Sequence, residues 1–574
     1  MTNKVIIALL ISAALTGCNE DNSNQSSLNQ VPNWLPKDAP VALNEQQLVS
    51  FSTRAASGLT PAQIDEINRI GYVKWLDNQF ESPVRLHLQK FEAAKDTIGN
   101  RVPVDGCKHV HYGTHDIREG IWWDALLYGN DQLRHRAAFA LSQILVVSQK
   151  DNPINGRNPQ SLVAFYDILQ KHAFGNYRDL LEEVTLSPSM GAFLSMANSK
   201  KHDPKRGTYP DENYAREVMQ LFTIGLYELN PDGTAKTDKD GNPISSYTQD
   251  DVQEVARAFS GWTYSDKMTN PDGSALHGEG YIKPMIPLED KRGTYHDEGE
   301  KRVINNVIAA GQTPLEDIQS VLDILFAHSN TAPFVSRQLI QRMVTSNPSP
   351  EYVERVAAVF TDNGNGVRGD LKSVFAAILL DPEALNPEVR NGMSQPESYP
   401  VVKMKEPILA VAEVLRILGA KTQGNYEQDA YSIINNVNQG LHSANSVFNF
   451  YSPDFMPSGP LMDSQLYAPE FEILPWAGFI GYQNTIRTYI VRSMQENRCD
   501  NAVYINVSEY QAAAKSDDVD ALPDLINQRF LAGKMSAELY ASIANAAAVE
   551  RHPNNKVMVS LLLVTASPEF LIQR

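Results

Sequence analysis

Apolar residues recur at helical spacing through most of this chain, and the alternation typical of strands is scarce. One such segment begins at Thr60 and Pro61, an N-capping residue and a proline suited to the first helical position, and continues to Phe80. The same spacing predicts further helices over residues 131–147, 162–172, 177–186, 248–259, 314–326, 332–344, 351–360, 371–380, 407–418, 474–497 and 557–565. The sequence therefore predicts a mainly α fold, a large multi-helix globular body with a few short hairpins and long irregular loops.

Three stretches interrupt the helical pattern. Residues 231–246 are rich in turn-forming Asn, Pro, Asp and Gly and predict a hairpin between two helices. Residues 265–300 form a Gly-, Pro- and charge-rich loop, a kind of segment that is often functional. Residues 443–470 are irregular and aromatic, and the rings of residues 448–451 could stack on sugars or belong to the core.

The N-terminus has the pattern of a targeting segment. Lys4 precedes an apolar run over residues 5–14, and Leu15-Thr-Gly-Cys18 then resembles the bacterial lipobox, in which the cysteine is lipidated. The alternative is an ordinary signal peptide with a chance cysteine. Asn19 favours the outer membrane over the inner membrane, because an aspartate there would resemble the retention signal. We therefore predict a lipoprotein of the bacterial cell envelope that is held to the membrane through Cys18.

Composition divides the rest of the chain. Residues 1–18 are the expected lipoprotein signal peptide, and residues 19–44, rich in Asn, Ser and Gln, predict a flexible tether. Residues 45–574 are expected to form a single large α-helical domain, in which an N-terminal subdomain (45–200) and a C-terminal subdomain (301–574) could be distinguished.

Charge and cysteine content narrow the function classes. A net charge of −18 with no Lys/Arg-rich run argues against nucleic-acid binding, which depends on neutralising phosphates. Apart from Cys18, the chain has Cys107 and Cys499, which could form a disulfide in an oxidising compartment or remain two free thiols.

The densest group of functional side chains lies in residues 209–225. A helix predicted over 210–225 carries Glu212 and Arg216 four residues apart, followed by Glu217. These residues could act as acid, base or metal ligand, with Arg216 as a clamp for an anionic group. The alternative is a structural helix start held by the Glu212–Arg216 pair.

Histidines supply the other candidates. The spacing of His109, His111 and His115 could hold a divalent metal, although chance is not negligible with 12 histidines. His296, next to Asp297, could serve as a base or ligand delivered to the Glu212–Glu217 helix by its loop. The alternative for His296 is a loop histidine that binds the backbone.

Several segments resemble one family. They are residues 60–80, the Glu212-Asn-Tyr-Ala-Arg-Glu217 motif, residues 247–262, His296-Asp-x-Gly-x-Lys301 and the closing Ala566-Ser-Pro-Glu-Phe570. The family is the bacterial "domain of unknown function 1800" group, and the likeness runs from about residue 45 to the end. It implies a secreted, α-rich protein with no established activity.

The resemblance also implies a partner. Relatives are commonly encoded beside members of the "domain of unknown function 1501" family, which resemble alkaline phosphatases and sulfatases. One departure concerns residues 139–145, where many relatives have a Trp-His-x-His-Phe segment and this chain has Phe-Ala-Leu-Ser-Gln-Ile-Leu.

Signatures of stronger known sites are missing from the sequence, including the nucleophile elbow, the phosphate-binding loop, the dinucleotide fingerprint and the zincin motif. Two hypotheses follow. The first is a lipid-anchored envelope protein that binds or assembles with a phosphatase/sulfatase-like partner. The alternative is a hydrolase acting on an anionic or carbohydrate substrate, with a divalent metal as a candidate cofactor.

Overall fold

The computed structural model describes residues 32–95, 114–265, 279–386, 402–422, 437–495 and 503–573, without residues 38, 151 and 292. Over these residues the chain forms 26 α-helices, and no strand is longer than three residues. The predicted mainly α fold with short hairpins is therefore confirmed.

The first half of the chain forms a series of mostly short helices. They are α2 (Glu45–Ala55), α3 (Pro61–Ile70), α4 (Tyr72–Glu81), α5 (His87–Lys95), α6 (Thr114–Tyr128), α7 (Gln132–Ser142), α8 (Pro153–Arg157), α9 (Pro159–His172), α10 (Tyr177–Thr185), α11 (Pro188–Phe193), α12 (Asn213–Gln220) and α13 (Gln249–Ala258).

The second half of the chain is also mainly helical and follows a short 3₁₀ helix, η1 (Glu279–Tyr281). Its helices are α14 (Pro314–Ala327), α15 (Thr331–Met343), α16 (Pro350–Thr361), α17 (Leu371–Leu380), α18 (Pro382–Leu385), α19 (Pro407–Ile417), α21 (Pro460–Asp463), α22 (Glu470–Ile473), α23 (Trp476–Ser493), α24 (Ser508–Ala514), α25 (Ala521–Leu531), α26 (Ala537–Val549), α27 (Pro553–Ala566) and α28 (Pro568–Leu571).

The strands form five separate antiparallel pairs. The pairs are β1 (Trp262–Thr263) with β2 (Ile286–Pro287), β3 (Glu289–Asp290) with β4 (Gly293–Thr294), β5 (Lys301–Val303) with β6 (Asn306–Ile308), β7 (Lys403–Met404) with β10 (Ile572–Gln573), and β8 (Lys421–Thr422) with β9 (Val503–Tyr504). The β7–β10 pair ties the end of the chain to its middle. Gln573 continues this link, since its side-chain NH₂ donates to the carbonyl of Met343 at 2.8 Å.

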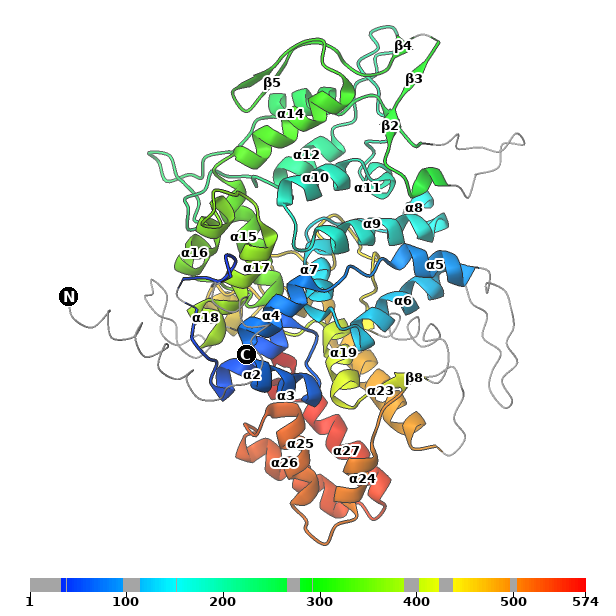
Figure 1. Ribbon diagram of the computed structural model, residues 1–574, viewed down its shortest axis with the longest axis vertical. Coiled ribbons are helices and arrows are strands. Elements are labelled where there is room, and N and C mark those ends of the chain that lie inside the picture. Colours follow the sequence, from blue (N-terminus) through cyan, green and yellow to red (C-terminus); the bar gives the residue numbers. More distant parts are fainter. Residues whose placement is uncertain are drawn as a thin grey trace, which may run out of the picture.

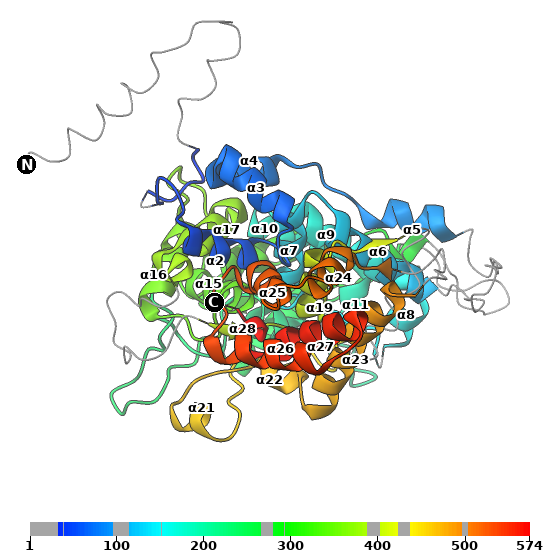
Figure 2. The ribbon, with the colours of Figure 1, turned by 90° about the horizontal axis from the view of Figure 1, so that it is seen from below.

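The helices pack around one apolar core that runs from Trp34 to Leu571, so burial of apolar surface is the main stabilising term. Figure 1 shows α14 and β5 at one end of the long axis and α24 to α27 at the other. In Figure 2, α3 and α4 lie on one side of the body and α26 and α27 cross nearer the other. The proposed subdomains at 45–200 and 301–574 stay a prediction. Among the described residues, no helix has both the length and the apolarity to cross a membrane.

Most predicted helices are confirmed, with informative exceptions. The predicted helix over 371–380 is α17, and α13 begins at Thr248 with a capping box completed by Asp251. A single helix over 60–80 is wrong, because Gly71 takes φ +82° and separates α3 from α4. The helix predicted over 131–147 ends early, at Ser142, and α2, α6 and α24 to α26 were not predicted.

The turn-rich segment 231–246 forms the predicted hairpin, with bridges between Leu229 and Ala235 and between Thr237 and Pro243. At its tip, the carboxylate of Asp238 accepts the backbone N–H groups of Asp240 and Asn242, each at 2.9 Å. The carboxylate therefore closes a turn, as its local sequence predicts.

Candidate functional site

The Glu212-Asn-Tyr-Ala-Arg-Glu217 motif forms a surface contact between two helices. Glu212 precedes α12, and its carboxylate lies 3.2 Å from the guanidinium of Arg216. Gln249 at the start of α13 bridges both, accepting from Arg216 at 3.0 Å and donating to Glu212 at 2.8 Å. Both charged side chains are more than a third exposed (38% and 35%). The ion pair therefore contributes at most about 1 kcal/mol to the free energy of unfolding. The helix predicted over 210–225 is shorter in the structure and ends at Gln220.

Glu217, on the same helix, is buried instead. Glu217 is 8% exposed, and its Oε2 atom has no hydrogen-bond partner among the described residues. Burial raises the pKa of this carboxyl group, and the charge of Arg216 offsets only part of the increase. Glu217 thus has more of the properties of a site residue than Glu212 or Arg216. Within the described part of the chain, however, it does not belong to a group of three His, Cys, Asp or Glu side chains that could hold a metal ion.

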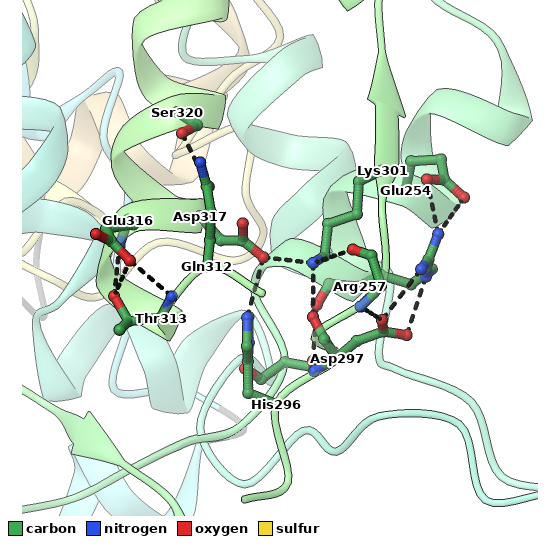
Figure 3. A network of polar contacts seen from close by, with 12 residues as sticks. Glu254, Arg257, His296, Asp297, Lys301, Gln312, Thr313, Glu316, Asp317 and Ser320 are labelled. Carbon is green, nitrogen blue, oxygen red and sulfur yellow. Dashed lines mark hydrogen bonds and ion pairs between the residues drawn. The ribbon is translucent and has the colours of Figure 1, made fainter. Parts of the chain in front are cut away.

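His296 lies in a separate, fully buried cluster (Figure 3). Its Nδ1 is 2.9 Å from the carbonyl of Ser260, and its Nε2 is 3.0 Å from the carboxylate of Asp317 on α14. Lys301 forms an ion pair with the same carboxylate and donates to the carbonyls of Asp297 and Gly299. Both partners of the His296 ring are acceptors, so both contacts are satisfied only when each ring nitrogen carries a hydrogen.

The next residue extends this network toward α13. The carboxylate of Asp297 accepts hydrogen bonds from Nε and Nη2 of Arg257, each at 3.0 Å. Arg257 also donates to the carboxylate of Glu254 at 2.8 Å (Figure 3). Burial alone would raise the pKa of Asp297, but the hydrogen bond and charge of Arg257 outweigh it and lower that pKa. The His296-Asp-x-Gly-x-Lys301 motif therefore links β5, α13 and α14 into one structural unit.

A glycine lets the chain pass close to this cluster. Gly261 has φ +81°, and a Cβ atom there would lie 2.5 Å from the backbone nitrogen of His296. No other residue type fits such an approach without displacing backbone.

The structure does not bring the predicted residues together. Among the described residues, no hydrogen bond or ion pair joins His296 to Glu212, Arg216 or Glu217. Their catalytic roles stay a prediction, as does the metal site. His109 and His111 lie outside the described residues, together with Cys18, Cys107 and Cys499. Within the described part of the chain, no three His, Cys, Asp or Glu side chains are arranged to hold a metal ion.

One predicted residue, His115, does line a cavity. This cavity has a volume of about 760 Å³ and is walled by α6, by the segment after α7, by residues 438–450 and by the end of α22. His115, Arg118 and Glu119 of α6 all contribute to the lining. Its size falls within the range of roughly 300–1,000 Å³ that is usual for small-molecule sites.

The cavity contains a buried ion pair. The side chains of Arg118 and Glu119 are each 2% exposed, and the guanidinium lies 2.5 Å from the carboxylate. Arg118 also donates to the side chain of Gln149 at 3.1 Å and to the carbonyl of Leu441 at 3.4 Å. A buried pair held this way mainly fixes geometry, since the cost of removing two charges from water is comparable to their attraction.

The remaining wall is polar and interlinked. Gln149 donates to the hydroxyl of Ser443 at 2.8 Å, and Lys150 donates to the amide oxygen of Asn445 at 2.7 Å. The carboxylate of Glu472 accepts the backbone N–H of Ser452 at 2.9 Å. Segments far apart in the sequence are thereby fixed around the same space before any ligand enters.

A second buried network supports the cavity floor. Gln439, which lines the cavity, and Gln143 both donate to the carboxylate of Glu406. Lys403 lies 3.0 Å from Glu470 and 3.9 Å from Glu406, and all three charged residues are almost fully buried. Residues 139–145, which depart from the family resemblance, thus supply an amide to this network.

Three buried histidines cluster around Tyr166, and one of them, His442, is adjacent in sequence to the lining residue Ser443. The rings of His87, His135 and His442 surround Tyr166, with centroid distances to it of 5.4, 6.0 and 5.9 Å. Burial lowers the pKa of His87 to about 3, with the charge of Lys90 as a smaller cause. Burial also lowers the pKa of His135 and His442 well below the usual value. These imidazoles are therefore neutral at pH 7.

Sequence reasoning missed Arg118, Glu119 and the three buried histidines. A signal for the first two exists: two adjacent charges stand just before the apolar stretch Ile121-Trp-Trp123, which is expected to be buried. The histidines gave no comparable signal, because they come from α5, α7 and the segment around residue 442.

Fold and site together define an α-helical protein with a preformed polar cavity. The family model described as "Protein of unknown function (DUF1800)" matches residues 50–572, and the chain belongs to this family. No curated protein and no solved structure matches the chain.

Proposed function

We propose that this protein is an envelope protein that binds a polar ligand in the Arg118–Glu119 cavity. The ligand is a small molecule or a short segment of a polymer. The buried Arg118–Glu119 pair inside a cavity of about 760 Å³ carries this proposal. Buried charges that face an open space have no stabilising advantage over apolar residues of the same size, so their presence favours a role in recognition.

The rest of the lining supports a binding role. Gln149 and Ser443 hold each other in place, as do Lys150 and Asn445, so the polar groups lose little freedom when a ligand enters. Preorganised, convergent polar groups are what orient a ligand in most small-molecule sites.

The leader sequence and the family resemblance motivate two further parts of this proposal. The protein would be attached through a lipid on Cys18 to the outer membrane and would act with a partner of the "domain of unknown function 1501" family. Membrane fractionation with and without globomycin, which blocks lipoprotein processing, would test the anchor, and co-purification from the native host would test the partner.

Replacing Arg118 by Met together with Glu119 by Leu is expected to abolish ligand binding while the fold persists. Apolar residues of similar volume in place of a buried pair are often neutral or stabilising by about 1–4 kcal/mol. The measurement is isothermal titration of the purified protein with a panel of probes: neutral hexasaccharides, hexagalacturonate, inorganic phosphate and a glycine tripeptide. At least one probe should bind the parent protein and none the double variant.

The matched control is the surface pair outside the cavity. Replacing Glu212 by Leu and Arg216 by Met removes the same two charge types and should leave binding unchanged, because neither side chain lines the cavity. Equal binding by the parent and the Arg118/Glu119 variant would place the ligand elsewhere.

A hydrolase is the second candidate, favoured by one observation. Glu119 from α6 and Glu472 from α22 are two carboxylates on different elements that line the same cavity, and hydrolysis of glycosides commonly uses such a pair. Release of shorter sugars from the panel hexasaccharides, lost in Glu472→Gln, would establish it.

A further inference from the structure

We infer that the ligand of the Arg118–Glu119 cavity is a neutral oligosaccharide that stacks on Phe450. This inference rests on the binding function proposed above and specifies the chemistry of its ligand. Three properties of the lining lead to it: its charge balance, its amide content and its aromatic side chains.

Charge balance argues against an anionic ligand. The cations of the lining already have partners: Arg118 is held by Glu119, Gln149 and the carbonyl of Leu441, and Lys150 is held by Asn445. The carboxylates of Glu119 and Glu472 balance these two positive charges. Since the whole chain carries −18 as well, an anion would approach against the overall field.

The uncharged polar groups suit hydroxyl groups. The lining contains the amides of Gln149, Asn438, Gln439 and Asn445 and the hydroxyl of Ser443. Gln149 is bonded to Arg118 and Ser443, and Gln439 to Ile408 and Glu406, so the amide of Asn438 and the NH₂ group of Asn445 are the groups that would meet a ligand. An amide presents both a donor and an acceptor, and a sugar hydroxyl does the same, so the two kinds of group pair without a charge mismatch. A phosphate or carboxylate would meet acceptors that it cannot satisfy.

The aromatic side chains favour a ligand with apolar faces. Phe450 lines the cavity and is only partly buried. Its position follows from a fixed turn: Asn449 has φ +70° and donates its backbone N–H to the carbonyl of Ser446 at 3.1 Å. A pyranose ring has an apolar face that packs on an aromatic ring, whereas a phosphate or a glycine peptide has no such face.

Two further aromatics extend this surface beyond the cavity. Phe448 and Phe471 are 44% and 47% exposed, and each stands within two residues of a cavity residue, Phe450 or Glu472. The hydrogen bond from Ser452 to Glu472 holds their two segments together. Exposed rings on both sides of this contact indicate a ligand longer than one sugar unit.

Titration with cellohexaose, maltohexaose, xylohexaose, chitohexaose and hexagalacturonate tests the inference on the purified full-length protein. At least one neutral hexasaccharide should bind, and hexagalacturonate should bind at least about ten-fold more weakly. Phe450→Ala should weaken the neutral ligand roughly three- to ten-fold, the effect expected when one aromatic stacking contact is lost. Phe471→Ala should weaken the hexasaccharide but not the matching disaccharide.

Tyr209→Ala is the matched control, because Tyr209 is 74% exposed and lies outside the cavity lining. Its affinity should equal that of the parent protein. If hexagalacturonate binds as tightly as the neutral sugars, or if Phe450→Ala leaves the affinity unchanged, the inference is overturned.

The same panel separates this inference from the proposed function. Binding of phosphate, hexagalacturonate or the tripeptide alone, with loss in the Arg118/Glu119 variant, would refute the saccharide and keep the binding site. Binding of none of the probes by the folded parent protein would count against both.

Discussion

Replacing Asp317 by Asn is expected to lower the free energy of unfolding by about 3–5 kcal/mol, the usual cost of removing one partner from a buried ion pair. Asp317 is fully buried, and its carboxylate faces the ammonium of Lys301 and the ring of His296. With an amide in its place, the charge of Lys301 would face neutral acceptors alone, the carbonyls of Asp297 and Gly299 and the amide oxygen at 317.

Urea unfolding of the parent and variant proteins gives the measurement, and the same helix offers the control. Asp323 on α14 pairs with Arg178 at 2.6 Å, but its side chain is 69% exposed. Asp323→Asn should therefore change stability by no more than about 1 kcal/mol. Equal losses in the two variants would mean that burial of the Asp317 cluster has no special weight.

A double replacement separates the cost of a lone charge from the value of the pair. Asp317→Leu together with Lys301→Met removes both charges and should be much less destabilising than Asp317→Asn. A loss as large as that of the single variant would indicate that the cluster itself, including His296, stabilises the fold.

Helix boundaries followed from local sequence where caps and periodicity agreed. Residues 374–380 are apolar throughout, and the helix lies between Asp370, which caps α17, and Asp381. At Gly71 the same reasoning failed, because apolar spacing continues across a residue whose left-handed conformation ends one helix and starts the next. The Ala-rich α26 was missed since it buries only Ile543 and Ala547, so its apolar stripe is faint.

The candidate site was harder to predict than the fold. The sequence pointed to residues 209–217 and 296–301 as candidate sites. In the structure their charges join helices: Glu212 and Arg216 meet Gln249 at the start of α13, and Lys301 pairs with Asp317 of α14. Arg118 meets the carbonyl of Leu441 across 323 residues of chain, a contact that no local pattern announces. Only tertiary structure shows which charges face a cavity.

The second large expected effect is loss of stability in mild acid. His87 has its pKa lowered from 6.5 to about 3 by burial, and the pKa values of His135 and His442 are lowered well below 6.5 for the same reason. Below pH 6.5 the unfolded chain binds protons at these positions and the folded chain does not, so the free energy of unfolding falls as the pH decreases. Between pH 7.5 and 5.5 the buried His87 alone lowers the free energy of unfolding by about 1 kcal/mol, and His135 and His442 act in the same direction.

Asp167 acts in the opposite direction. Burial raises its pKa from 3.8 to about 6, although its carboxylate accepts the backbone N–H groups of Leu88 and His87. Its folded form therefore binds a proton more readily than its unfolded form, and stability increases as the pH falls through 6. Over the same interval Asp167 raises the free energy of unfolding by about 1 kcal/mol, which is less than the combined loss from the three histidines.

His442→Phe isolates one contribution, because a phenyl ring fits beside Phe165 and Tyr166 and cannot be protonated. Urea unfolding at pH 7.5 and 5.5 should show a smaller loss of stability in this variant than in the parent protein. The exposed His202, replaced by Phe in the same way, should leave the pH dependence unchanged. If His442→Phe keeps the full acid loss, the imidazole of His442 is already solvated in the folded protein and its burial does not contribute to the acid sensitivity.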